Sequence, residues 1–419
     1  MAATALPKPE PARVRSVAQM AAEPAIAEAL RFFSSNKKWI LERQVELCRI
    51  PAPTFQEQAR AEWLSGQFRA LGLDARLDRA GNVIASPPGA ADGAAIAVTA
   101  HLDTVLEPLT PEDIRAGRDG ELRGPGVSDN GAGLAALLAI AAAVKQTRGL
   151  AESPLPFMLI ANVGEEGEGN LSGMRYICRP AGMGSRIRGF LVLDGPFTDH
   201  ITTRALASRR FEIALNGPGG HSWSDHGMPN PVHAMGRVIA QFTENPANGN
   251  QGGRVSYNFG LVEGGTSVNS IPTVARAKLD LRSENPARID EMAALLTACV
   301  EHALEVENDR STGPRLTAKI REIGSRPGGQ LADDAPILTH LRAVDAHLGI
   351  RSQVDCASTD ANIPLSIGVP AVSIGAGGQG GGAHTPNEWF RADGRDLGLR
   401  RVFLTLCLLM RELDPAAAR

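Results

Sequence analysis

Two polar side chains, His101 and Asp103, follow directly after an apolar run and are separated by a single residue. The run from Ile96 to Ala100 suits a strand that is buried on both faces of a parallel sheet. Because alternate residues of an extended chain share a face, the imidazole and the carboxylate point the same way. A histidine that binds a metal usually donates its other N–H to a carboxylate. The pair therefore predicts a metal ligand with its orienting partner, although a solvated strand end is the commoner explanation for such a pair alone.

The same pattern recurs at two further apolar runs. Leu155 to Val163 leads into Glu165 and Glu166, and Phe190 to Leu193 leads directly to Asp194. In open α/β sheets, ligands gather outside the carboxyl ends of the strands, so we expect all these side chains at one sheet edge. Two adjacent carboxylates at such an edge fit a division of labour in which one binds a metal and the other moves protons.

Two further candidates lie in loops, Asp129 in SDNGAG and His384 in AHTPNEW. Taken alone, Asp129 has an ordinary explanation as a helix cap, and a lone histidine in a loop is more often structural than a ligand. Together the candidates supply two imidazoles and three carboxylates without cysteine, which suits zinc, with cobalt or manganese as alternatives. Five ligands are too many for one tetrahedral ion, but they suit a pair of ions ~3.5–4 Å apart that share one carboxylate.

Apolar patterning predicts an α/β protein whose first domain is interrupted by a second. Helical spacing over 25–50 and 55–71 precedes the strands described above, and residues 1–22 resemble a loosely ordered tail. Over 206–323 the expected order is strand, helix, strand, strand, helix, strand, which is that of a ferredoxin-like α+β unit. The expected domains are thus a catalytic domain made of 1–205 and 324–419, with a central mostly parallel sheet, and an inserted domain over 206–323.

Composition places the chain among ordinary globular proteins. It has 419 residues, 43% of them hydrophobic, and a formal net charge of −3, which gives no indication of a nucleic-acid or membrane partner. Five scattered cysteines indicate reduced thiols rather than a disulfide framework or a thiolate metal site. No apolar run approaches the ~20 residues of a membrane span, and the N-terminus has no apolar signal segment. We therefore expect a cytoplasmic protein.

Eight segments together resemble the signature series of a known family, and they occur in that family's order. They are TAHLDTV, GPGVSDNGAG, GEEGEG, LDGP, GPGGHSW, GGTSVNSIP, LDLRS and GGGAHTPNEW. The series resembles the co-catalytic di-zinc exopeptidase and aminoacylase family, which includes peptidase T, carnosinase-type dipeptidases, aminoacylase, succinyl-diaminopimelate desuccinylase and the glutamate carboxypeptidases. The resemblance covers about residues 35 to 415. It implies a zinc-exopeptidase-like catalytic domain interrupted by a lid that also mediates dimerisation.

The resemblance also implies which residues hold the two zinc ions expected in each chain. His101 and Asp194 would bind one ion, and Glu166 and His384 would bind the other. Asp129 would bridge the two ions, and the peptide bond after it would be cis.

Five further residues receive roles from the resemblance. Glu165 would be the general base that takes a proton from a metal-activated water, and Asp103 would orient the first histidine ligand. His221 in the lid would stabilise the oxyanion, often across the interface of a homodimer. Asn269 and Arg282 would contact the carboxylate of the substrate, for which a bidentate arginine is well suited.

Several details favour the peptidase T branch of the family. Aspartate rather than glutamate at position 194, together with GGHSWSDHG and AHTPNEW, resembles peptidase T-like members. We therefore expect an aminopeptidase that hydrolyses the amide bond of di- and tripeptides. The alternative is an N-acyl or N-carbamoyl amino-acid amidohydrolase, whose substrate is an N-substituted amino acid.

Two interpretations from other classes are weaker. Gly131-x-Gly133-x-x-Ala136 matches the dinucleotide fingerprint of an oxidoreductase, but it follows a loop rather than a strand. A non-catalytic binding protein on the same fold should have lost ligands or the base, whereas all these positions are filled.

Overall fold

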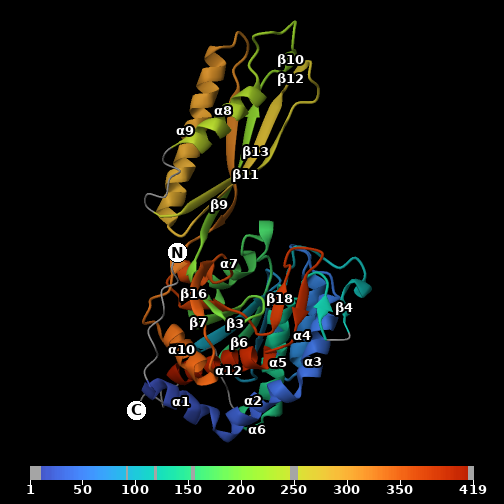
Figure 1. Ribbon diagram of the computed structural model, residues 1–419, viewed down its shortest axis with the longest axis vertical. Coiled ribbons are helices and arrows are strands. Elements are labelled where there is room, and N and C mark those ends of the chain that lie inside the picture. The colour runs from blue at the N-terminus through green and yellow to red at the C-terminus, as the bar shows by residue number, and fades with distance from the viewer. Residues whose placement is uncertain (1–10, 91–92, 118–119, 152–155, 246–252, 414–419) are drawn as a thin grey trace. The chain divides into compact units, whose positions relative to one another are not determined.

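The computed structural model describes residues 11–90, 93–117, 120–151, 156–245 and 253–413. The chain divides into two compact units, which Figure 1 shows. The first unit contains the described residues up to Ala205 and from Gly329 onward, and the second is Leu206–Gly328. The expected insertion ended at residue 323. The second unit continues further because its last strand reaches Arg326.

The first unit is built on a mixed sheet. Its strands are β1 (Asp74–Leu77), β2 (Val83–Ser86), β3 (Ala95–His101), β6 (Phe157–Asn162), β7 (Ile187–Leu193), β8 (His200–Ala205), β15 (Gly329–Gln330), β16 (Gln353–Ala357) and β17 (Ala371–Ile374). Among the described residues the order is β1-β2-β6-β3-β7-β17-β8-β15, with β16 also paired to β8. The central run β6-β3-β7-β17 is parallel, whereas β1 and β2 are antiparallel. The parallel centre brings the carboxyl ends of its strands to one edge.

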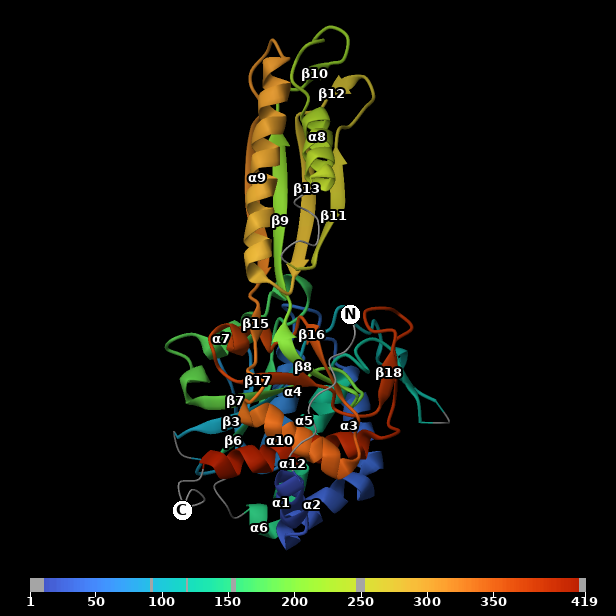
Figure 2. The same cartoon turned by 60° about the vertical axis from the view of Figure 1, so that its left-hand side comes forward.

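Helices enclose this sheet (Figure 2). They are α1 (Pro11–Ala21), α2 (Pro24–Ser35), α3 (Lys37–Cys48), α4 (Gln58–Ala70), α5 (Gly131–Gln146), α6 (Arg148–Ala151), α7 (Ser172–Cys178), α10 (Pro336–Leu348), α11 (Asn362–Ser366) and α12 (Arg395–Leu413). Helices α5 and α12 pack against β3, and α5 is buried along almost its whole length, which accounts for its alanine- and leucine-rich sequence. Short strands β4 (Arg115–Ala116), β5 (Leu122–Arg123), β18 (Gln379–Gly381) and β19 (Trp389–Arg391) form a separate small sheet in this unit.

Two expectations for the N-terminal region were wrong. Residues 11–21 form helix α1 rather than a loose tail, because Val17 and Met20 are buried and the helix packs against α10. Residues 1–10 of that expected tail lie outside the described residues. The helical stretch over 25–50 is two helices, interrupted at Asn36, whose side-chain amide donates to the carbonyl of Phe32 at 3.0 Å. Such a local side-chain bond competes with continuation of the helix.

The second unit is an antiparallel sheet with two helices. Its elements are β9 (Ala207–Asn216), β10 (Gly220–His221), α8 (Pro231–Glu244), β11 (Val255–Gly264), β12 (Ser270–Ile271), β13 (Val274–Ser283), α9 (Pro286–Asp309) and β14 (Thr317–Arg326). The main sheet has the order β11-β13-β9-β14, and β10 pairs with β12 in a separate two-stranded sheet. Figures 1 and 2 show α8 and α9 on one face of the main sheet. Buried residues alternate along β13, as expected for a sheet covered on one side.

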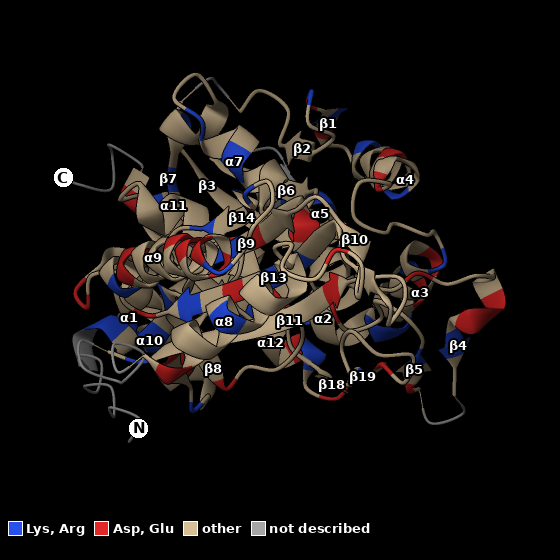
Figure 3. Ribbon diagram, turned by 90° about the horizontal axis from the view of Figure 1, so that it is seen from above, with Lys and Arg blue, Asp and Glu red and all other residues tan. Residues whose placement is uncertain are grey.

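Charges of both signs are interspersed over the elements rather than gathered by sign, as Figure 3 shows. Among the residues that the structure describes, no helix is long and apolar enough to cross a membrane.

Candidate metal centre

The ends of three parallel strands place the first group of predicted ligands. Strands β3 and β6 are in register at their last residues, where His101 pairs with Asn162, and β7 runs parallel on the other side of β3. Glu165 and Glu166 follow the end of β6, and Asp194 follows the end of β7. The sheet therefore brings these side chains to one edge, as the sequence predicts.

Asp129 lies between the two predicted histidine ligands. Its Oδ1 is 3.0 Å from His101 Nε2, and its Oδ2 is 3.1 Å from His384 Nε2. Asp194 Oδ1 lies 3.9 Å from the same nitrogen of His101, while Glu166 Oε1 lies 2.8 Å from that of His384. Each oxygen of one carboxylate thus faces a different imidazole, as a carboxylate shared by two ions would require.

The ligand atoms fall into two groups that share Asp129. His101, Asp129 and Asp194 form one group, and Asp129, Glu166 and His384 form the other, with the ligand atoms of each group all within 4.8 Å of one another. The structure therefore brings all five predicted ligand positions together, in the two sets that the family resemblance implies. Nitrogen and oxygen donors without thiolate are a set that fits zinc, cobalt or manganese.

The predicted base and orienting residues are tied to the same ligands. Glu165 forms a third close group with His101 and Glu166. Asp103 is fully buried, and its carboxylate accepts the backbone N–H groups of Glu165 at 3.0 Å and Glu166 at 2.8 Å. His101 Nδ1 lies 2.9 Å from the carbonyl oxygen of Asp103 and 3.6 Å from its carboxylate. Asp103 therefore fixes both the imidazole and the segment that carries the two glutamates.

The segment after Asp129 is shaped by close packing, and its peptide bond to Asn130 is cis, as expected. A Cβ on Gly131 would lie 2.5 Å from Cys48 Sγ, and one on Gly133 would lie 2.3 Å from Asn130 Oδ1. The glycines of the apparent dinucleotide fingerprint are thus required by neighbouring protein atoms. The oxidoreductase interpretation loses its support.

Sequence reasoning missed several buried polar side chains near the ligands. Glu57 accepts the backbone N–H of Gly164 at 3.0 Å, just before the two glutamates. Asn162 donates to Asp360 at 2.6 Å, and burial, reinforced by the charges of nearby aspartates, raises the pKa of Asp360 to about 7. No spacing rule connects these residues to the ligands, since each contact joins segments that are distant in sequence.

The pKa shifts of the candidate ligands show that the carboxylates of this centre favour positive charge on the groups beside them. Hydrogen bonds to Asp129 and then to Glu166 raise the pKa of His384 to about 10. Burial opposes the charged form of His101, but bonds to Asp103 and Asp129 still raise its pKa well above the ordinary value. Burial likewise opposes ionisation of Asp129, yet its two histidine partners hold its pKa well below the usual range. In the metal-free protein, protons on the imidazoles compensate the carboxylates.

Metal binding should therefore release protons. The raised pKa of His384 keeps it protonated up to about pH 10, whereas a ligating imidazole must be neutral. At pH 7.5 we expect roughly two protons to be released as zinc fills the centre, one from each histidine, and zinc affinity to fall as the pH is lowered. The ion pairing of protonated His384 with Asp129 and Glu166 also stabilises the metal-free fold. Because this pairing raises the pKa of His384, its contribution is fully present below about pH 6.5 and is lost as the pH rises through about 10. Calorimetry in buffers of different ionisation enthalpy measures the release, and a binding enthalpy independent of the buffer would contradict it.

Of the three substrate-contacting residues predicted in the inserted domain, His221 and Asn269 lie close together and Arg282 does not. His221 and Asn269 lie together at the β10–β12 strand pair, where the N–H of Ser222 donates to the carbonyl of Asn269 at 3.0 Å. Arg282 lies near the far end of β13, paired with Ser208 at the start of β9. Since β9 spans 10 residues, Arg282 is roughly 30 Å from the β10–β12 strand pair at ~3.3 Å per residue.

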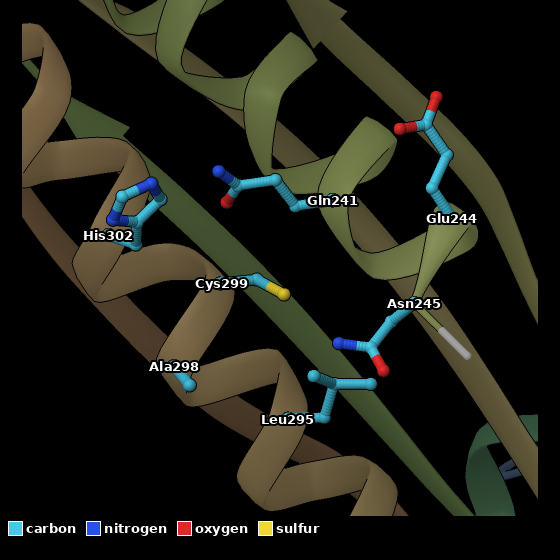
Figure 4. Close-up of a pocket in the computed structure, with 7 residues that line it drawn as sticks. All are labelled: Gln241, Glu244, Asn245, Leu295, Ala298, Cys299 and His302. Carbon is cyan, nitrogen blue, oxygen red and sulfur yellow. The ribbon is translucent and has the colours of Figure 1, made fainter. Parts of the chain in front are cut away.

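A hollow in the second unit contributes no candidate ligand group. It has a volume of about 360 Å³ and lies between α8 and α9 (Figure 4). Its lining includes Cys299 and His302. Among the described residues, the groups of side chains able to hold a metal all belong to the first unit, and none includes either of these two.

Comparisons with known proteins show which proteins the chain is similar to. The chain is 23% identical over 367 residues to the uncharacterized protein YqjE of Bacillus subtilis, which covers 84% of this chain and 93% of YqjE. A tripeptidase from Staphylococcus aureus has a TM-score of 0.73 at 20% identity, covering 90% of this chain and 99% of the tripeptidase. Aminopeptidase PepT from Bacillus cereus has a TM-score of 0.70 at 20% identity, and the match covers 89% of this chain and 99% of PepT. At these identities the solved structures show a shared fold, so the expected fold class is confirmed.

The family itself is shown by a family model. The model for Peptidase family M20/M25/M40 matches residues 97–406, from β3 to α12. The expected family resemblance is therefore confirmed. The chain belongs to peptidase family M20/M25/M40 and is a metallo-exopeptidase or amidohydrolase.

Proposed function

We propose that this protein is a dimetal aminopeptidase that removes the first residue of di- and tripeptides. The observation that carries the proposal is the position of Asp129, each of whose carboxylate oxygens faces a different histidine. Two zinc ions per chain, with cobalt or manganese as alternatives, fit the nitrogen and oxygen donors of the two ligand groups. When bound, such ions would activate a water and polarise the scissile carbonyl.

Glu165 is the residue that we assign to proton transfer. It lies within reach of His101 and Glu166, and its backbone N–H is held by Asp103. From this position its carboxylate would take a proton from the attacking water and deliver it to the amine nitrogen that leaves. Glu166, held against His384 at 2.8 Å, would serve as a ligand instead. The two adjacent glutamates thus divide binding from proton transfer.

The preference for a free amino terminus rests on Asp194 and Arg282. Aspartate is one methylene shorter than glutamate, which leaves room beside Asp194 for the terminal amine of a peptide. Arg282 would hold the carboxylate at the other end of the substrate. The distance between the two contacts would then limit the length of the peptide. A tripeptidase and an aminopeptidase among the structures of similar fold support this choice.

We further propose a homodimer formed through the second unit. A tripeptide spans at most roughly 10 Å at ~3.3–3.6 Å per residue, so it cannot contact both Arg282 and the β10–β12 strand pair of the same unit. The two contacts are compatible if Arg282 comes from one chain while His221 and Asn269 come from its partner. Strand β11 is an edge strand among the described residues, and its exposed Leu261 and Val262 suit it for pairing with a second copy.

Substrate comparison tests the proposed specificity. We expect zinc-reconstituted protein to hydrolyse free di- and tripeptides, to reject their N-acetylated counterparts, and to act slowly on C-terminal amides. Arg282→Ala should lower kcat/KM for free-acid tripeptides roughly tenfold to a hundredfold, or ~1.5–3 kcal/mol, because a charged hydrogen bond is lost. It should have little effect on the amides.

Arg276→Ala is the matched control, because Arg276 is an exposed arginine on the same strand that pairs with Glu263. It should leave both rates near wild type. Faster hydrolysis of N-acetyl or N-carbamoyl amino acids than of the matching peptides would instead favour the amidohydrolase.

A further inference from the structure

We propose that Glu388 is a positioning residue that holds the backbone of Asp129 in place for metal binding and joins it to the segment that carries His384. The inference rests on the proposed dimetal function. The carboxylate of Glu388 accepts hydrogen bonds from backbone N–H groups and not from the side chains of the proposed ligands. Its effect would therefore be exerted through the backbone of Asp129.

The contacts of Glu388 are concentrated on one short loop. Its Oε2 accepts the backbone N–H of Gly126 at 2.8 Å. Its Oε1 accepts the backbone N–H groups of Ser128 and Asp129, both also at 2.8 Å. The side chain is 3% exposed, so water does not compete strongly for these bonds. One buried carboxylate thus satisfies three N–H groups of the loop that ends at the bridging ligand.

The charge and shape of glutamate both suit this arrangement. Three N–H donors converge on two oxygens, and bonds to an ionised acceptor are shorter and stronger than neutral ones. A buried N–H group left without an acceptor costs about 1–3 kcal/mol, so the loop needs an acceptor at this place. Glutamine has the same shape, but its amide has one oxygen and one donor group. Its amide N–H₂ group would therefore face at least one of the backbone N–H groups, and two donors cannot form a hydrogen bond with each other.

Glu388 also couples two ligand-bearing segments. Its own carbonyl accepts the N–H of Gly124 at 3.0 Å, and its N–H donates to the carbonyl of Thr385, the residue after His384. The loop is supported from α3 as well, since Gln44 donates to the carbonyl of Val127 at 2.5 Å. The residue is therefore linked to both Asp129 and His384, which come from segments more than 250 residues apart.

Zinc binding to the whole protein tests the assignment. Metal-free wild type and Glu388→Gln would be titrated with zinc against a competing chelator. We expect wild type to bind about two ions and Glu388→Gln to bind at least one of them tenfold to a hundredfold more weakly, the usual effect of removing a partner that orients a ligand. Glu388→Asp keeps the charge but has a shorter reach, so we expect an intermediate loss.

Glu307→Gln is the matched control for a purely structural effect. Glu307 is also a buried glutamate that accepts a backbone N–H, from Asn230 at 3.1 Å, but it lies in the second unit. We expect it to lower the unfolding temperature without changing zinc affinity. Zinc affinity of Glu388→Gln within threefold of wild type, or an equal loss in Glu307→Gln, would overturn the inference. Wild type that binds no zinc would instead contradict the dimetal proposal and this inference with it.

A second measurement covers the case in which Glu388→Gln does not fold. Hydrogen exchange of the metal-free wild type should be slow at the amides of Gly126, Ser128 and Asp129, because Glu388 accepts all three. Exchange there as fast as in exposed loops would mean that the three bonds are not maintained, and it would overturn the inference without any variant.

Discussion

Replacing Glu165 by glutamine should abolish peptide hydrolysis while leaving about two zinc ions on each chain, because we assign this residue to proton transfer and not to metal binding. Glutamine keeps the size of the side chain and its backbone bond to Asp103, but it cannot accept a proton from water. A positioned acid–base residue typically contributes a factor of ~10²–10⁴, so kcat should fall by at least a hundredfold. KM should change little, since the substrate contacts remain.

The neighbouring glutamate supplies the matched control. Glu166→Gln removes the carboxylate that lies 2.8 Å from His384 Nε2 and that we propose as a metal ligand, so zinc content should fall along with activity. Metal analysis after gel filtration separates the two variants. Activity of Glu165→Gln within tenfold of wild type would show that the base is assigned wrongly. Equal zinc loss in both variants would show that the two glutamates do not divide binding from proton transfer.

The gathering of His101, Glu165 and Asp194 at one edge of the sheet was predictable from the sequence because a few local patterns determine it. Apolar runs that end in His101, Glu165 and Asp194 identify buried parallel strands, and their carboxyl ends must meet wherever the strands lie in register. The loop ligands Asp129 and His384 depended on the family resemblance, since each alone has an ordinary structural explanation. The fold brings these two side chains close together, and neither segment alone predicts that contact.

The features that were missed depend on contacts between distant segments. The helix over 11–21 buries Val17 and Met20 and packs against α10, which lies more than 300 residues later in the chain. Glu57 and Glu388 act on backbone N–H groups, and backbone groups carry no sequence signature. Local patterns cannot reveal such partners, because the polar residue and the loop that it supports are unrelated in spacing.

Mixing two inactive variants should restore activity if His221 acts across the dimer. In a mixed dimer of His221→Ala and Glu165→Ala chains, one site combines the intact Glu165 of one chain with the intact His221 of the other. The second site lacks both. Random refolding of equal amounts makes about half the dimers mixed, so we expect about one quarter of wild-type activity in a twofold-symmetric assembly.

A chain that carries both substitutions, mixed with wild type, provides the control. If His221 acts across the interface, neither site of that mixed dimer is complete, and only the wild-type dimers, about one quarter of the total, are active. If His221 acts within its own chain, the wild-type half of every mixed dimer works, and activity rises to about one half, while the two single variants give none together. The separation of Arg282 from the β10–β12 strand pair within one unit favours the first result, because a tripeptide is too short to reach both. Recovery of one quarter in both mixtures would therefore show that the His221 of each chain acts at the metal centre of its partner.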